Sequence, residues 1–180
     1  MILGLLGVTL LPACPLLDLQ ADVQSACVRY SDVAVDPEPQ VSATIEKSFT
    51  VDDLDSLKQL ADDGFQLSFA SGDVATASGV SDFSFVKSAT VDVASGDADS
   101  TLPTLEFNCT NCGSAATELD FTPADAGSGS TSAATIDAKP YFDSGSLIVT
   151  VGLTGMPPAV AWSMDVDVCV TGTASYEVNE

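Results

Sequence analysis

The stretch AVAWSMDVDVCVTGTASYEV (residues 159–178) restricts the fold more than any other part of the chain. Apolar and polar residues alternate along it, and an alternation with period two is typical of a β-strand that buries one face. We therefore expect a long strand over 159–178, with Trp162 in the core and Cys169 on the outer face or at an edge of the sheet. The residues that share the parity of Trp162 are Met164, Val166, Val168 and Val170.

Similar patterns recur at short, roughly even intervals along the chain, separated by Gly, Pro, Asp and Ser. One segment differs: in DDLDSLKQLADDG (52–64), the leucines have the three-residue spacing of one helix face. We expect Asp52 or Asp53 to cap this helix and Gly64 to end it. The strand over 82–95 changes parity near Lys87, which predicts a β-bulge. The other strands are expected at 26–35, 41–51, 65–69, 104–109, 116–122, 133–138 and 146–154.

Composition and order together give the fold class. Of the 26 acidic residues, 20 are Asp, which favours turns and caps over helix interiors. Strands without a βαβ rhythm predict an all-β protein, an antiparallel β-sandwich of the immunoglobulin-like or jelly-roll-like kind with one short helix. We expect a single domain over 26–180, because too little sequence follows the Gly- and Ser-rich loop at 122–133 to form a second core.

The net charge of −21, with only five Lys and Arg, excludes a basic surface patch. Such a chain repels phosphate groups, so nucleic acid is excluded as a partner. An acidic excess of this size is also typical of proteins that work in high salt.

The N-terminus indicates export. Residues 2–11 are apolar but too few to span a bilayer, and they have the length of a signal-peptide core. Leu11-Pro12-Ala13-Cys14 resembles the lipobox of bacterial lipoproteins. This resemblance implies a signal peptide over 1–13, acylation of Cys14 and a tether over 14–25. It places the protein at the outer membrane, since Pro15 replaces the Asp of the inner-membrane retention signal, or at the cell surface. An ordinary signal peptide, or a buried strand with a disulfide at Cys14, are the alternatives.

Without Cys14, an even set of four cysteines remains, as expected for disulfides in an oxidising compartment. Four cysteines allow three pairings. Their spacing favours Cys109 with Cys112, across a turn, and Cys27 with Cys169, joining the first strand to the last. A zinc site built from all four is disfavoured in that compartment.

The chain contains no histidine, which removes Ser-His-Asp and Cys-His catalysis and the usual proton shuttle at neutral pH. Two carboxylates suffice for glycoside hydrolysis, and Glu46, Glu106 and Glu118 are the in-strand candidates. With 26 acids, chance pairs are inevitable. We expect no enzymatic activity and no cofactor.

Calcium is the most credible ligand, because closely spaced Asp residues supply the hard oxygens that it prefers. Weak candidates are Asp97 with Asp99 in a loop, and Asp52, Asp53 and Asp55 at the helix start. Helix capping and solvated turns are the simpler roles for these residues, so we expect no metal site.

The sequence therefore predicts a non-catalytic, exported β-sandwich, attached to the membrane through lipid on Cys14. It would act as a surface or periplasmic binding or scaffold module for a protein or polysaccharide. The alternative is a self-assembling subunit of an extracellular fibre or coat, in which the 159–178 strand offers an edge for strand addition.

Overall fold

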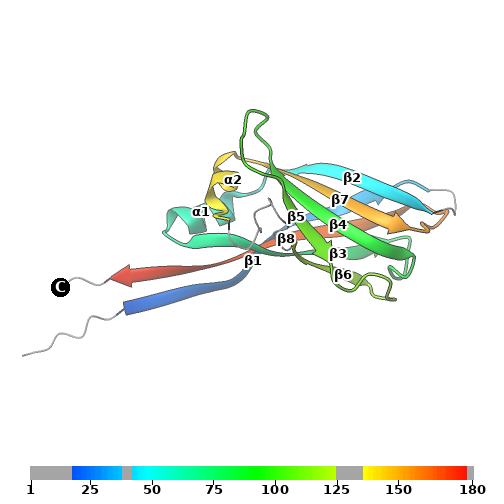
Figure 1. The fold of residues 1–180 in the computed structure, drawn as a ribbon, viewed down its shortest axis with the longest axis horizontal. Coiled ribbons are helices and arrows are strands. Elements are labelled where there is room, and N and C mark those ends of the chain that lie inside the picture. The colour runs from blue at the N-terminus through cyan, green and yellow to red at the C-terminus, as the bar shows by residue number, and fades with distance from the viewer. Residues whose placement is uncertain (1–17, 38–41, 125–135, 178–180) are drawn as a thin grey trace, which may run out of the picture.

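The computed structural model describes residues 18–37, 42–124 and 136–177 (Figure 1). Eight strands and two short helices follow one another along the chain. The strands are β1 (Asp18–Val35), β2 (Ala43–Val51), β3 (Gln66–Ser78), β4 (Val86–Ser95), β5 (Leu105–Cys109), β6 (Glu118–Pro123), β7 (Leu147–Gly155) and β8 (Trp162–Glu177), and the helices are α1 (Asp55–Asp62) and α2 (Lys139–Asp143).

All eight strands form one antiparallel sheet in the order β1-β8-β3-β6-β5-β4-β7-β2. The sheet curls over itself, so that the two edge strands, β1 and β2, approach each other. Their contact is made by side chains: the rings of Tyr30 and Phe49 stack with centroids 4.4 Å apart, and Lys47 lies 4.0 Å from Asp36. The predicted class, an all-β antiparallel sandwich, is confirmed, with the two layers formed by the halves of a single, nearly closed sheet.

The core lies between the two halves and is built from alternate residues of every strand. On β8 the alternation holds as predicted: Trp162 is 3% exposed, and Met164 and Val170 are completely buried. The predicted bulge near Lys87 is also confirmed, since the register of β4 against β7 shifts between Val86 and Ser88. The largest side chains of the core include Phe69, Phe83, Phe107, Phe121, Tyr141 and Phe142.

Helix α1 begins later than expected. Its N-cap is Leu54, without a side-chain cap, so the prediction that Asp52 or Asp53 caps the helix is wrong. Burial of Leu54 and Leu57 fixes this start by packing rather than by capping. The predicted end is confirmed: Gly64 has φ +96°, a left-handed conformation that glycine adopts without strain.

A second helix, α2, makes the prediction of a single helix wrong. A strand was expected over 133–138, of which 133–135 lie outside the described residues. Asp137 forms only an isolated bridge with Ser68, and α2 follows directly. The buried ring of Tyr141 holds this helix against the core, and its hydroxyl donates to the carbonyl of Pro103 at 2.7 Å. In the part of the chain described, no helix is long and apolar enough to cross a membrane.

Strand β1 begins at Asp18, so the predicted tether is wrong for residues 18–25, which pair with β8. Strand β3 begins at Gln66, which pairs with Thr173 of β8. Four pairs between β1 and β8, from Asp18↔Glu177 to Ala21↔Ala174, lie beyond this point. They form a two-stranded arm that projects from the body (Figure 1). From Ser163 to Thr173, β8 lies between β1 and β3, so the expectation that this strand offers a sheet edge is wrong there. Over Ala174–Glu177, in the arm, β1 is its one neighbour among the described residues.

Both predicted disulfides are present. Cys27 and Cys169 face each other directly in the β1–β8 register, with Cα atoms 4.0 Å apart. Their bond lies on the outer face, as expected, where Cys27 is exposed and Cys169 is buried. Cys109 and Cys112 close the turn after β5. One bond joins the first strand to the last, and the other closes a local turn.

The two disulfides should contribute unequally to stability. In the chain-entropy model, closing a loop over a sequence separation of 142 is worth about 5 kcal/mol, and over a separation of 3 about 2 kcal/mol. We expect Cys27→Ser with Cys169→Ser to lower the free energy of unfolding in urea much more than Cys109→Ser with Cys112→Ser. Equal losses would contradict an entropic role for the long-range bond.

Candidate functional site

The predicted calcium ligands do not converge. The carboxylate of Asp97 accepts a hydrogen bond from the backbone N–H of Asp99 at 3.0 Å, and its carbonyl accepts one from Ser100 at 3.1 Å. These contacts are those of a local turn. Cys14, the predicted lipidation site, lies outside the described residues.

At the start of α1, the three aspartates also have local roles. Asp55 lies in the first turn, where a carboxylate interacts favourably with the helix dipole. The carbonyl of Asp52 accepts a hydrogen bond from the N–H of Leu54 at 3.1 Å. In the described ranges, neither these residues nor Asp97 and Asp99 belong to a group of three carboxylates close enough to share a metal ion.

A different set of acids comes together on the outer face of the sheet. The strand register places Arg29 opposite Asp167, Asp167 opposite Asp73, and Asp73 opposite Asp120. This line of one cation and three carboxylates crosses β1, β8, β3 and β6, and we call it the carboxylate row. Because directly opposed side chains on one sheet face are about 5 Å apart, the row concentrates negative charge.

Arg29 offsets the charge at one end of the row. Its guanidinium donates to both carboxylate oxygens of Asp167, from Nε at 2.9 and 3.2 Å and from Nη2 at 2.6 Å. This bidentate geometry is the strong form of an Arg–carboxylate pair. The hydrogen bonds with Asp167 raise the pKa of Arg29 above its ordinary value. Asp167 is therefore neutralised, whereas Asp73 and Asp120 are not neutralised by Arg29.

At the other end of the row, the carboxylate of Glu118 lies close to those of Asp73 and Asp120. One carboxylate oxygen from each lies within 4.8 Å of the other two. Partial burial and the neighbouring charges of Glu118 and Asp120 raise the pKa of Asp73. Three such oxygens are the donor type that a divalent cation prefers, so this cluster, and not the predicted aspartates, is where the described chain could hold one.

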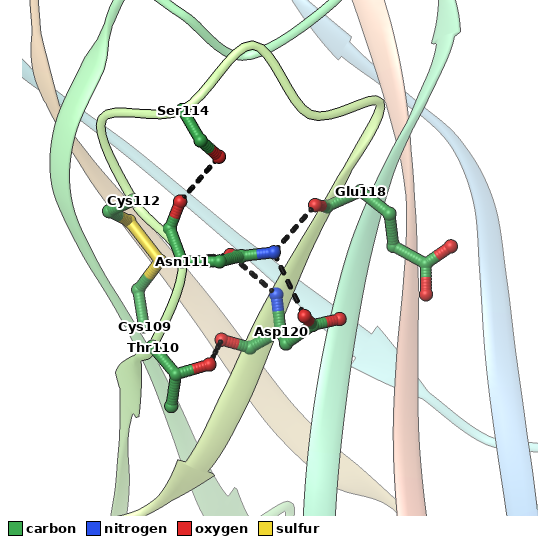
Figure 2. The surroundings of a disulfide bond; sticks show 7 residues. All are labelled: Cys109, Thr110, Asn111, Cys112, Ser114, Glu118 and Asp120. Atoms are coloured by element: carbon green, nitrogen blue, oxygen red, sulfur yellow. Dashed lines mark hydrogen bonds between the residues drawn. A yellow bond between two sulfur atoms is a disulfide. The ribbon is translucent and has the colours of Figure 1, made fainter.

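The Cys109–Cys112 turn fixes Asp120. The side-chain amide of Asn111 donates to the Asp120 carboxylate at 2.9 Å and to the Glu118 carbonyl at 3.1 Å (Figure 2). Its carbonyl accepts the backbone N–H of Asp120 at 3.0 Å. Three hydrogen bonds from one side chain therefore tie the disulfide turn to the start of β6.

The predicted glycosidase candidates do not meet as one pair. Glu106 is opposite Asp92 in the β4–β5 register, and the negative charge of Glu46 also lies close enough to Asp92 to raise its pKa. Burial, first, and then these two glutamates raise the pKa of Asp92. Glu118, on β6, lies beside the carboxylate row, in the cluster with Asp73 and Asp120. The two acidic groups are separate, and both lie on the outer face of strands.

Three loops form the end of the body opposite the arm: 79–85, 110–117 and 156–161. We call this end the tip. Backbone hydrogen bonds link the loops to one another and to β4: Phe83 N–H to Ala116 O at 2.8 Å, Gly113 N–H to Val86 O at 2.9 Å, and Met156 N–H to Phe85 O at 3.0 Å.

The tip exposes two large apolar side chains and contains an aromatic cluster. Met156 and Val160 are each 52% exposed, the largest values among the exposed large hydrophobic residues described. At the same end of the body, the ring of Trp162 meets Phe83 and Phe85 edge to face, with centroids 6.0 and 5.4 Å apart. Trp162 Nε1 is buried without a hydrogen-bond partner in the described structure.

Neither the carboxylate row nor the tip was found from the sequence. Asp73, Asp120 and Asp167 each stand on a separate strand, and only the strand order makes them neighbours. The alternation of Asp165 and Asp167 marks an outward face but does not identify what lies beside it. For the tip, no pattern separates exposed apolar loop residues from buried ones.

A search of protein-family models and of curated proteins finds no match to this chain. Among solved structures, a chain of Cocksfoot mottle virus matches with a TM-score of 0.32 and 10% identity, covering 99% of this chain and 95% of that chain. A chain of Desmodium yellow mottle tymovirus matches with a TM-score of 0.31 and 12% identity, covering 97% of each.

Neutralising Asp73 should stabilise the protein at neutral pH. Because its pKa is raised in the folded state, folding favours the protonated form, and stability is lost as the pH rises from the usual Asp value through the raised one. We expect Asp73→Asn to raise the free energy of unfolding at pH 7 by up to about 1 kcal/mol, since solvent still screens this half-buried group.

The control is Asp53→Asn, which removes one exposed carboxylate outside the row. Thermal unfolding of both variants at pH 7 and pH 3 checks the cause. The gain from Asp73→Asn should exceed that of the control at pH 7 and disappear at pH 3. A gain of the same size at both pH values would show that burial and repulsion of the ionised Asp73 carboxylate are not its origin.

Proposed function

We propose that this chain is an exported, non-catalytic binding module, anchored to the outer membrane through lipid on Cys14, that presents its tip to a partner. The single observation that carries the proposal is that the start of β1 and the loops of the tip lie at opposite ends of the body. Strand β1 begins at Asp18, four positions after Cys14, and its first residues belong to the arm. The loops of the tip lie at the opposite end of the same strands (Figure 1).

Two disulfides support the export step. One joins the first and last strands and the other closes a surface turn, and bonds of this kind persist in oxidising compartments. The absence of histidine from the sequence supports a non-catalytic role, since the common acid–base and nucleophile pairs need it.

The tip supports a protein as the partner. Met156 and Val160 expose apolar surface on the 156–161 loop, whose first residue donates a backbone hydrogen bond to Phe85, and a loop held in place loses little entropy on binding. The net charge of −21 favours a partner with a basic surface around an apolar centre, because complementary charge speeds association. A polysaccharide is the other candidate class.

The anchor is tested by detergent partition. The chain made with its own leader should enter the detergent phase, and Cys14→Ser should move it to the aqueous phase. Two or more acyl chains hold a protein on a membrane, because each buried CH₂ contributes about 0.8 kcal/mol. The matched control, Cys27→Ser with Cys169→Ser, should still enter detergent. If Cys14→Ser stays with the detergent, the anchor is elsewhere.

Self-assembly by strand addition is the second candidate, because β1 and β2 are edge strands. Several features of β1 oppose it. Bulges interrupt β1 between Val23 and Ala26 and between Tyr30 and Val33, and Asp32 has φ +59°. Bulges and charges on an edge strand hinder pairing with another chain.

We therefore expect sedimentation velocity to give a single monomer over the whole concentration range, at physiological salt and at high salt, where repulsion is screened. Growth of the sedimenting species with concentration would favour the fibre or coat subunit instead. High salt is the informative condition, since a charge of −21 alone could keep copies apart at low salt.

A further inference from the structure

The end of β5 and the turn after it contain an acceptor motif for N-linked glycosylation. Asn108-Cys109-Thr110 has the form Asn-x-Thr, in which the middle residue is not proline. We propose that Asn108 is modified with an N-linked saccharide during export. This inference extends beyond the proposed function and depends only on passage of the chain out of the cytoplasm.

The folded structure leaves room for the saccharide. Asn108 is an exposed residue of β5, between the buried Phe107 and the half-buried Cys109, so its side chain lies on the outer face. Its direct neighbours across the sheet are Thr90 on β4 and Thr122 on β6. Both are small and polar, so a saccharide on Asn108 displaces no packed group.

The amide of Asn108 is also free. Within the described residues its side chain makes no hydrogen bond, whereas Asn111, three positions later, uses its amide in three. Asn111 precedes Cys112-Gly113 and so has no hydroxyl two positions after it. Asn111 therefore holds the turn to β6 (Figure 2), whereas the side chain of Asn108 is available for modification.

The position of the Thr110 hydroxyl determines whether saccharide transfer comes before or after folding of the turn. In the folded protein, Thr110 Oγ1 donates to the carbonyl of Asp120 at 3.2 Å, and Cys109 is bonded to Cys112 (Figure 2). A transferase needs the segment extended, with this hydroxyl beside the acceptor amide. Transfer therefore precedes closure of the turn, and the exposed position of Asn108 lets the saccharide remain after folding.

The transfer is a substitution at the anomeric carbon of a lipid-diphosphate-linked saccharide. Asn108 Nδ2 loses one proton to a base of the transferase and forms the bond to that carbon. The bond between the carbon and the diphosphate oxygen breaks, and the lipid diphosphate leaves with its electron pair. No redox step occurs.

Mass spectrometry of peptides from the protein, produced with its own leader in its source organism, tests the site. We expect the peptide containing Asn108 to carry a saccharide mass, which is lost completely in Asn108→Gln and Thr110→Ala. Thr110→Ser keeps the hydroxyl and should keep the modification. Asn111→Ala, the matched control, should keep it too, because transfer precedes folding of the turn.

An unmodified Asn108 in the exported wild-type protein would overturn the proposal, and so would saccharide found only on serine or threonine. Removal of the saccharide by an amidase that converts the attached Asn to Asp gives a second readout on the wild-type protein. A new Asp at position 108 supports the proposal, and an Asn108 that carries no saccharide mass before the amidase and stays Asn after it contradicts the proposal.

Discussion

The pairing of the first strand with the last organises this molecule. Among the described residues, strand β1 is hydrogen-bonded to β8 and to no other strand, so the first strand can join the sheet only by pairing with the last one. Contacts between segments this distant cost loop entropy that has to be recovered elsewhere. The Cys27–Cys169 bond on the outer face reduces that cost, and burial of the inward residues of β8 in the core offsets more of it. The arm continues the same pairing beyond the body.

Charge is the second constraint, and the fold handles it by position. The acids of the strands alternate with apolar residues and therefore collect on the outer face, where water screens them. Where strand register brings several together, one cation or one amide limits the repulsion: Arg29 holds Asp167, and Asn111 holds Asp120. Asp73, between them, has neither kind of contact with these two residues, and its pKa is raised, first by partial burial and then by the neighbouring acidic charges.

Much of the fold was predictable because its signals are local. The alternation in β8, the leucine spacing in α1, Gly64 and the bulge near Lys87 are each readable within a few residues. The disulfide pairing followed from spacing and from the position of the strands. The N-cap of α1 was mispredicted because burial of Leu54 and Leu57 outweighed the capping preference of Asp52 and Asp53.

The candidate sites were not predictable, for a physical reason. Sequence patterns show which face of a strand is wet but not which strand lies beside it. The neighbours of β8 are β1 and β3, so neither the carboxylate row nor the interior place of β8 follows from alternation alone. The short helix α2 was missed for a related reason, since contacts of Tyr141 and Phe142 with Phe69, distant in sequence, stabilise it.

Strand β8 is an interior strand of the body, clamped between β1 and β3, and native-state hydrogen exchange tests this position directly. Amides of Ser163–Thr171 should exchange only with global unfolding, since both sides of the strand are hydrogen-bonded. Amides on the outer side of β2, which has one neighbour, should exchange faster. If alternate amides of β8 exchange as fast as those of β2, β8 is an edge, and the account of this fold is wrong.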